Sequence, residues 1–193
     1  MQKTLLILLL LFSLCFSPAK SQQLYRNSYA EISFFSETPI EDISAKNVAS
    51  ASLIDIDKNE VAVRIPMAKF IFPNKRMEEH FQENYLDTGK YPYATFKGKI
   101  NESIDWKKES RVKVSATGIL TMHGISHTEN IMGEISIVPS QRLVLDANFN
   151  IILARYNVEI PALLWTKIAE TVKLGAIITY LPVVNIPPSI TQK

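Results

Sequence analysis

Residues 111–122 read RVKVSATGILTM, and along this stretch apolar or small side chains alternate with mostly polar ones. Successive side chains of a β-strand point to opposite faces, so this period of two predicts a long strand with one buried face. The buried face would carry Val112, Val114, Ala116, Gly118, Leu120 and Met122, and the other face Lys113, Ser115, Thr117 and Thr121.

The same alternation recurs along most of the chain. Polar turns separate the alternating segments at Asp57–Glu60 and at His123–Ser126, where Gly124 can adopt a positive φ. Regular alternation with few helices predicts a sandwich or a barrel of about eight strands. Besides residues 111–122, the expected strands are residues 61–67, 142–153 and 171–180, and, with a weaker pattern, 30–35, 50–57, 93–100 and 129–138.

Two segments depart from the strand pattern. Residues 74–86 are predicted to form a short helix capped by Asn74, and residues 162–170, which follow Pro161, a second one. One face of the first helix is apolar, and it is predicted to form a lid or plug over one end of the fold. This face carries Met77, Phe81 and Tyr85.

A histidine and two carboxylates share another flank of the first helix. His80, Glu83 and Asp87 could approach a cation, but the ends of this trio are about 10 Å apart along a helix axis, so only two could bind one ion. The sequence therefore favours a surface His80–Glu83 pair, with Glu78 and Glu79 at the helix start facing solvent. No metal site and no cofactor is predicted.

The first residues predict a secretory signal peptide, residues 1–21. A basic start at Met1–Lys3 is followed by the apolar run Leu5–Phe12, which is too short to span a membrane, and then by small residues at Ala19 and Ser21. We therefore expect a periplasmic or secreted protein, with cleavage near Ser21.

Cleavage would leave residues 22–184 as one domain and residues 185–193 as a tail. It would remove Cys15, the only cysteine, so no disulfide is expected; lipid attachment at Cys15 is disfavoured because Leu14, not a small residue, precedes it. Nineteen basic residues would then balance 19 acidic ones. This balance argues against nucleic acid as a partner and against stable membrane insertion, and it leaves a homodimer open.

The predicted inner face mixes small and large residues. Small side chains can leave room for a ligand, or they can accommodate bulky neighbours such as Phe149 and Trp165. Because an eight-stranded barrel can fill its interior or hold one small ligand, both readings stay open. The small residues are Ala116, Gly118, Ala147 and Ala176.

Two long motifs resemble the YceI-like family. Residues 70–100 read FIFPNKRMEEHFQENYLDTGKYPYATFKGKI, and residues 114–128 read VSATGILTMHGISHT. They contain the family's K-Y-P-x-A-x-F at Lys90–Phe96 and its G-x-L-T-x-H-G-[IV]-[ST] at Gly118–Ser126. The segment FFSETPIEDISAKN, residues 34–47, is similar to secreted Bacteroidetes-type members.

The resemblance covers about residues 25–181 and implies a fold and a function. It implies an all-β fold, an antiparallel β-barrel of about eight strands, lipocalin-like, with one or two short helices and a long apolar channel. Members bind polyisoprenoid or other amphiphilic lipid chains, and many are periplasmic or secreted. Other members often carry Arg-Asp where this chain has Asn74-Lys75-Arg76, so no role of a charged pair is carried over.

The predicted function is a binding protein that holds an isoprenoid or fatty-acyl amphiphile. The chain has no G-x-S-x-G motif, which argues against an enzyme, and turn chemistry is favoured over headgroup contact for His123 and His127. The alternative is a barrel with a filled core that binds a protein partner. The candidate channel residues are Phe34, Ile65, Met67, Met77, Phe81, Tyr85, Phe96, Leu120, Met122, Phe149, Ile151, Trp165 and Ile178.

Overall fold

The alternating segments form antiparallel strands in the computed structural model, which describes residues 23–37, 42–159 and 169–183. Within these ranges, four short helical segments accompany the strands: η2 (Met67–Lys69), α2 (Lys75–His80), η3 (Phe81–Tyr85) and η4 (Leu153–Tyr156). The strands are β1 (Leu24–Ser36), β2 (Ile43–Asn47), β3 (Ala51–Asp55), β4 (Glu60–Pro66), β5 (Tyr93–Ile100), β6 (Ser110–Met122), β7 (Ile125–Val138), β8 (Arg142–Ile152) and β9 (Thr171–Pro182).

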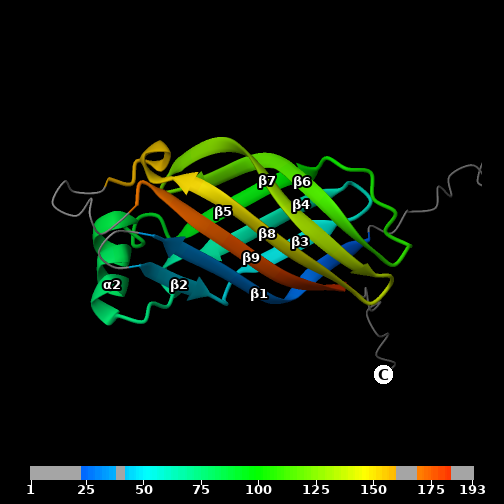
Figure 1. Cartoon of the computed structure of the whole chain (residues 1–193), viewed down its shortest axis with the longest axis horizontal. Helices are drawn as coiled ribbons and strands as arrows, with labels where there is room; N and C mark the ends of the chain where they lie inside the picture. The colour runs from blue at the N-terminus through cyan, green and yellow to red at the C-terminus, as the bar shows by residue number, and fades with distance from the viewer. Residues whose placement is uncertain (1–22, 38–41, 160–168, 184–193) are drawn as a thin grey trace, which may run out of the picture.

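Eight of these strands close into a barrel, as predicted. Neighbours run from β1 through β3 to β9 in sequence order, and β9 pairs back onto β1 from Tyr25↔Pro182 to Phe35↔Lys173. Figure 1 shows the long strands winding around one elongated body, with α2 at the end opposite the start of β1. Closure of the sheet leaves β1 and β9 without an open edge along this shared register.

The ninth strand, β2, was not predicted. Its five residues pair with β1 between Ile32 and Ser36, on the same edge that β3 uses at the other end of β1. The sequence ISAKN is too short and too polar for its alternation to stand out.

A buried polar network holds the backbone where the chain passes from β2 to β3. The side chain of Asn47 is fully buried, donates to the carbonyl of Pro66 (2.8 Å) and accepts from the amide of Ala49 (2.9 Å). Asn27 accepts from the amide of Ser52 (2.8 Å) and donates to the carbonyl of Ser50 (3.1 Å). The two asparagines thereby satisfy backbone groups that the interrupted ladder leaves unpaired.

The predicted hairpin turns are confirmed. Met122 pairs with Ile125 across a two-residue loop, and both loop residues have positive φ, 50° at His123 and 75° at Gly124. This is the backbone of a type I′ turn, whose twist matches that of the flanking strands. Asn59, in the other predicted turn, also has a positive φ, 55°.

The predicted faces of the strands are confirmed as well. In β6, Val114, Leu120 and Met122 are buried, whereas Lys113 and Thr117 are exposed. The same alternation of buried and exposed positions holds in β5, where Ala94, Phe96, Gly98 and Ile100 face inward. Hydrophobic alternation therefore fixes the register of each strand relative to the core.

The predicted helix at residues 74–86 is present but is not one uniform α-helix. Asn74 caps it by accepting from the amide of Arg76 (2.9 Å). The α-helical part ends at His80, and Phe81–Tyr85 form a π-helical turn in which the amide of Leu86 donates to the carbonyl of Phe81 (3.1 Å). The helix ends before Asp87, which has a positive φ of 38°.

Several predictions fall outside the described residues. They are the signal peptide at 1–21, the tail at 185–193 and nearly all of the second helix at 162–170, of which only Ala169 and Glu170 are described, ahead of β9. Within the described ranges, no helix is long and apolar enough to cross a membrane.

The end of the barrel opposite α2 is filled by side chains. Leu143 pairs with Ile137 on β7 and with Tyr180 on β9, and all three are almost fully buried. Trp106, in the segment between β5 and β6, packs on this core and donates from its indole to Asn59 (3.0 Å). Open space within the barrel therefore lies toward α2.

Candidate functional site

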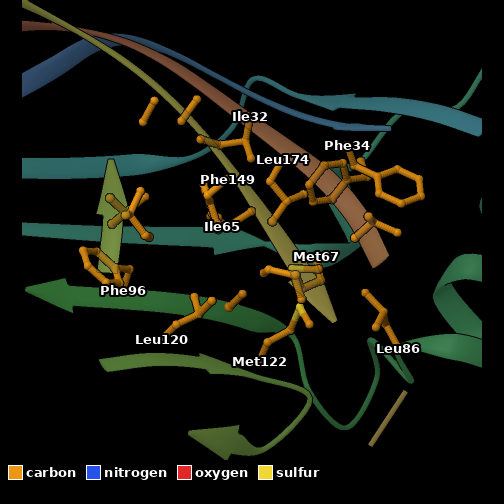
Figure 2. A pocket seen from close by; sticks show the side chains of 18 of the residues that line it. Ile32, Phe34, Ile65, Met67, Leu86, Phe96, Leu120, Met122, Phe149 and Leu174 are labelled. Carbon is orange, nitrogen blue, oxygen red and sulfur yellow. The ribbon is translucent and has the colours of Figure 1, made fainter. Parts of the chain in front are cut away.

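The interior of the barrel holds an apolar cavity of about 540 Å³. Figure 2 shows side chains entering it from facing walls, with Phe96 and Leu120 on one side and Ile32, Phe149 and Leu174 on the other. A volume of this size is typical of pockets that bury a small ligand. Of the two alternatives left open by the sequence, an interior with room for a ligand describes this part of the barrel, and a filled interior does not.

The cavity is elongated along the strands. On β6 its lining extends from Val114 to Met122, a span of about 26 Å along the strand at about 3.3 Å per residue. On β5 it extends from Ala94 to Ile100. Because strands in such barrels are tilted, the cavity is shorter along the barrel axis, about 20 Å. Its shape suits a chain better than a compact molecule.

The structure places twelve of the thirteen candidate residues in the wall of this cavity. Trp165 lies outside the described residues. That these side chains contact a ligand stays a prediction. The twelve are Phe34, Ile65, Met67, Met77, Phe81, Tyr85, Phe96, Leu120, Met122, Phe149, Ile151 and Ile178.

Other lining residues were missed by the sequence analysis. Several, such as Val114, Leu145 and Leu174, occupy the alternate positions that face inward in predicted strands. The alternation of the sequence was enough to choose them. Phe70 and Phe72 come from the irregular segment between β4 and α2, where no period marks the inner side. Their position follows only from the path of the chain over the barrel end.

Small residues serve two different purposes on the inner face. Ala116, Ala147 and Ala176 line the cavity and leave its space open. Gly118 does not: a Cβ there would meet the backbone of Lys97 and Gly98 on the neighbouring strand, so this glycine permits close approach of two strands. The sequence left open whether Gly118 makes room for a ligand or for bulky side chains; what it accommodates is the backbone of the neighbouring strand.

An aromatic cluster packs the helix at residues 74–86, which we call the lid, onto the barrel. The ring of Phe81, on η3, lies 4.9 Å from that of Phe72, 5.5 Å from that of Phe70 and 6.2 Å from that of Phe34 on β1, centroid to centroid. Offset and edge-on aromatic pairs at these distances stabilise packing beyond the area they bury. Met77 and Tyr85 also pack against the core, so the apolar face of the helix is turned to the cavity.

All polar side chains in the cavity wall come from the lid segment. Every other lining residue among those described is apolar or glycine. Burial raises the pKa of the Tyr85 phenol. The lid residues concerned are Asn74, Arg76, His80 and Tyr85.

The predicted His80–Glu83 surface pair is wrong. His80 forms no ion pair or hydrogen bond with a described residue; it is half-buried and faces the cavity, while Glu83 is exposed. The angular spacing of residues around a helix placed His80 on one flank, but it could not show that this flank borders an open interior.

The sequence pattern of the YceI-like domain matches residues 28–180. The chain belongs to the YceI-like family. None of the curated proteins is similar enough in sequence to match this YceI-like chain.

Solved structures share the fold of this YceI-like barrel. A polyisoprenoid binding domain from Saccharophagus degradans, implicated in plant cell wall breakdown, is 14% identical with a TM-score of 0.70 over 82% of this chain and 98% of its own. BcnA of Burkholderia cenocepacia is 18% identical, with a TM-score of 0.66 over 78% and 95%. The YceI protein of Campylobacter jejuni is 21% identical, with a TM-score of 0.61 over 77% and 89%. At these identities the likeness shows the fold.

The two histidines of the second YceI-like motif anchor a turn. His123 contacts the carbonyl of Tyr156 through Nδ1 (3.0 Å), and His127 contacts the carbonyl of Arg155 through Nε2 (2.8 Å). Tyr156 is fully buried and donates to Glu129 (2.9 Å). These contacts hold η4 against the β6–β7 hairpin, and neither histidine lines the cavity.

No group of three or more His, Cys, Asp or Glu side chains in the described ranges is arranged to hold a metal ion.

Proposed function

We propose that this YceI-like barrel binds an isoprenoid-like or other amphiphilic lipid, with the apolar chain inside the barrel. The observation that supports it is the elongated cavity, whose wall is apolar except at the lid. Its family and the fold it shares with a polyisoprenoid binding domain support the same class of ligand.

Burial of the chain would supply the binding free energy. Each Å² of apolar surface removed from water contributes about 25 cal/mol, and ordering the ligand offsets part of this gain. The aromatic and aliphatic wall offers no buried polar group that such a chain would leave unpaired. Affinity should therefore rise with chain length until the cavity is filled.

The proposed activity is binding rather than catalysis. In the described part of the chain, the cavity wall carries no carboxylate, serine or cysteine, and its polar groups are confined to one end. The alternative function, a filled barrel that binds a protein partner, has less support because the interior is open.

We propose further that the protein is exported, as a secreted or periplasmic member of the Bacteroidetes type. The apolar run Leu5–Phe12 and the small residues before Gln22 support cleavage near Ser21. A binding protein for an amphiphile is useful in an aqueous compartment, where a free lipid chain would otherwise aggregate.

Native mass spectrometry tests the proposed binding. The protein should carry one amphiphile per chain, either as purified or after incubation with farnesol or palmitate, and organic solvent should release it. An unmodified mass under both conditions would contradict the proposal.

A further inference from the structure

The polar groups of the cavity are gathered at one end, and this gives an amphiphile a single favoured orientation. From Val114 and Ile100 to Phe34 and Met122 the wall is apolar. In the part of the chain that the structure describes, polar side chains enter the wall only along residues 74–85, at the barrel end where α2 lies (Figure 1). A ligand that enters this cavity would therefore place its tail among the strands and its head beneath the lid.

The charge of these groups indicates the charge of the head. Among the described residues, the lining includes a guanidinium, Arg76, and an imidazole, His80, but no carboxylate. Arg76 has no ion pair and no side-chain hydrogen bond with any described residue. Its five N–H donors are therefore available to a ligand, in a geometry that suits phosphate and carboxylate oxygens.

The acidic residues of the same segment are directed elsewhere. Glu78 pairs with Lys75 (2.8 Å) and also accepts from the amide of Phe72 (3.2 Å), which lowers the pKa of its carboxyl. Glu79 and Glu83 are exposed, and none of these three lines the cavity. The donors therefore border the cavity, where His80 and Tyr85 are half-buried and Arg76 and Asn74 are exposed at its end, whereas these three carboxylates do not border it.

From this arrangement we propose that Arg76 and His80 form a headgroup site for an anionic amphiphile, with a carboxylate or a phosphate as its head. The inference rests on the proposed binding function and adds the class of headgroup. The amide of Asn74 and the hydroxyl of Tyr85 stand at the same end and can complete the hydrogen bonding of an anion. Asn74 already uses its carbonyl oxygen to cap α2, which leaves its NH₂ group as the donor.

The test compares anionic and neutral ligands that have the same tail. Affinities of farnesyl phosphate and farnesol, and of palmitate and hexadecanol, are measured for the wild type and for the double variant Arg76→Gln with His80→Gln. The wild type should bind the anions about tenfold or more tightly than the alcohols, as expected for charge-assisted hydrogen bonds. The double variant should lose this preference and keep its affinity for the alcohols, which shows that it is folded.

Lys75→Gln is the matched control. It removes the same charge from the same helix, but Lys75 pairs with Glu78 and does not line the cavity, so the preference for anions should remain. A preference for only one of the two anions would support the site and identify its head as phosphate or carboxylate.

The outcomes separate the two proposals. Equal affinity of the wild type for anions and alcohols would overturn the headgroup site and leave the proposed binding function intact. A preference that survives in the double variant would also overturn it. Failure of all four ligands to bind would overturn both.

Discussion

At the scale of single residues, the fold depends on polar side chains that are buried with their partners. The hydroxyls of Tyr180 on β9 and Ser52 on β3 lie 2.7 Å apart in the filled end of the barrel. Ser52 gives its one hydrogen to the carbonyl of Ala62 (2.9 Å), so Tyr180 is the donor to Ser52. Burial raises the pKa of the Tyr180 phenol above its ordinary value of 10.0.

This burial predicts a loss of stability at alkaline pH. A phenol whose pKa is raised by folding stabilises the protein below its unfolded pKa, and this contribution falls as pH rises above about 10, because the unfolded chain ionises first. For Tyr180 the loss grows as pH rises further above 10, as long as the buried phenol of the folded protein keeps its proton. Tyr156, whose pKa is raised first by burial and then by its hydrogen bond to Glu129, adds to the same trend.

The variant Tyr180→Phe isolates this effect. At pH 8 it should be less stable by about 1 kcal/mol, the usual cost of one lost hydrogen bond, with Ser52 still bonded to Ala62. At pH 11 the difference in stability between the two proteins should be smaller than at pH 8, as measured by urea unfolding at both pH values. Tyr93→Phe, which removes an exposed hydroxyl, is the control. Parallel losses in wild type and Tyr180→Phe would contradict the account.

At the scale of elements, alternation predicted the strands and their inward faces, but not everything that borders the cavity. A period of two is strong in β6, β8 and β9 because each separates a core from solvent. It is weak in β2, and the segment between β4 and α2 has no period at all. His80 is a second case that alternation and helix periodicity could not predict. Its side chain borders the cavity, and no local sequence pattern shows that the barrel interior is open.

The inward face of β9 offers a direct test of the cavity. Ala176 lines it and is paired with Ala147 on the neighbouring strand β8 and with Ile32 on the neighbouring strand β1. The next residue, Ile177, points outward and is 47% exposed. Ala176→Phe should fill the middle of the cavity and lower the affinity for farnesol about tenfold or more. Its effect on unfolding should be small, about 1 kcal/mol, because empty space receives the ring.

Ile177→Phe is the matched control for this variant. It places a ring of the same size one residue away, on the outside of the barrel, and should leave the affinity for farnesol unchanged. Equal binding by wild type and both variants, measured by calorimetry, would show that the ligand lies elsewhere.

At the scale of the whole molecule, the barrel combines a filled end and an open end. The side chains of Tyr180, Ile137 and Leu143 close the first, and the lid formed by α2 and η3 covers the second. The barrel and its closure could be predicted from the sequence. The size of the cavity could not, because it depends on how side chains from distant strands share the interior.

The most direct measurement of the central claim is the position of a ligand's tail in a crystal of the complex. A fatty acid brominated at its terminal carbon would give an anomalous bromine peak. We predict one peak inside the barrel, near Ile100 and Val114 and away from α2. A peak on the outer surface of the strands would contradict the account.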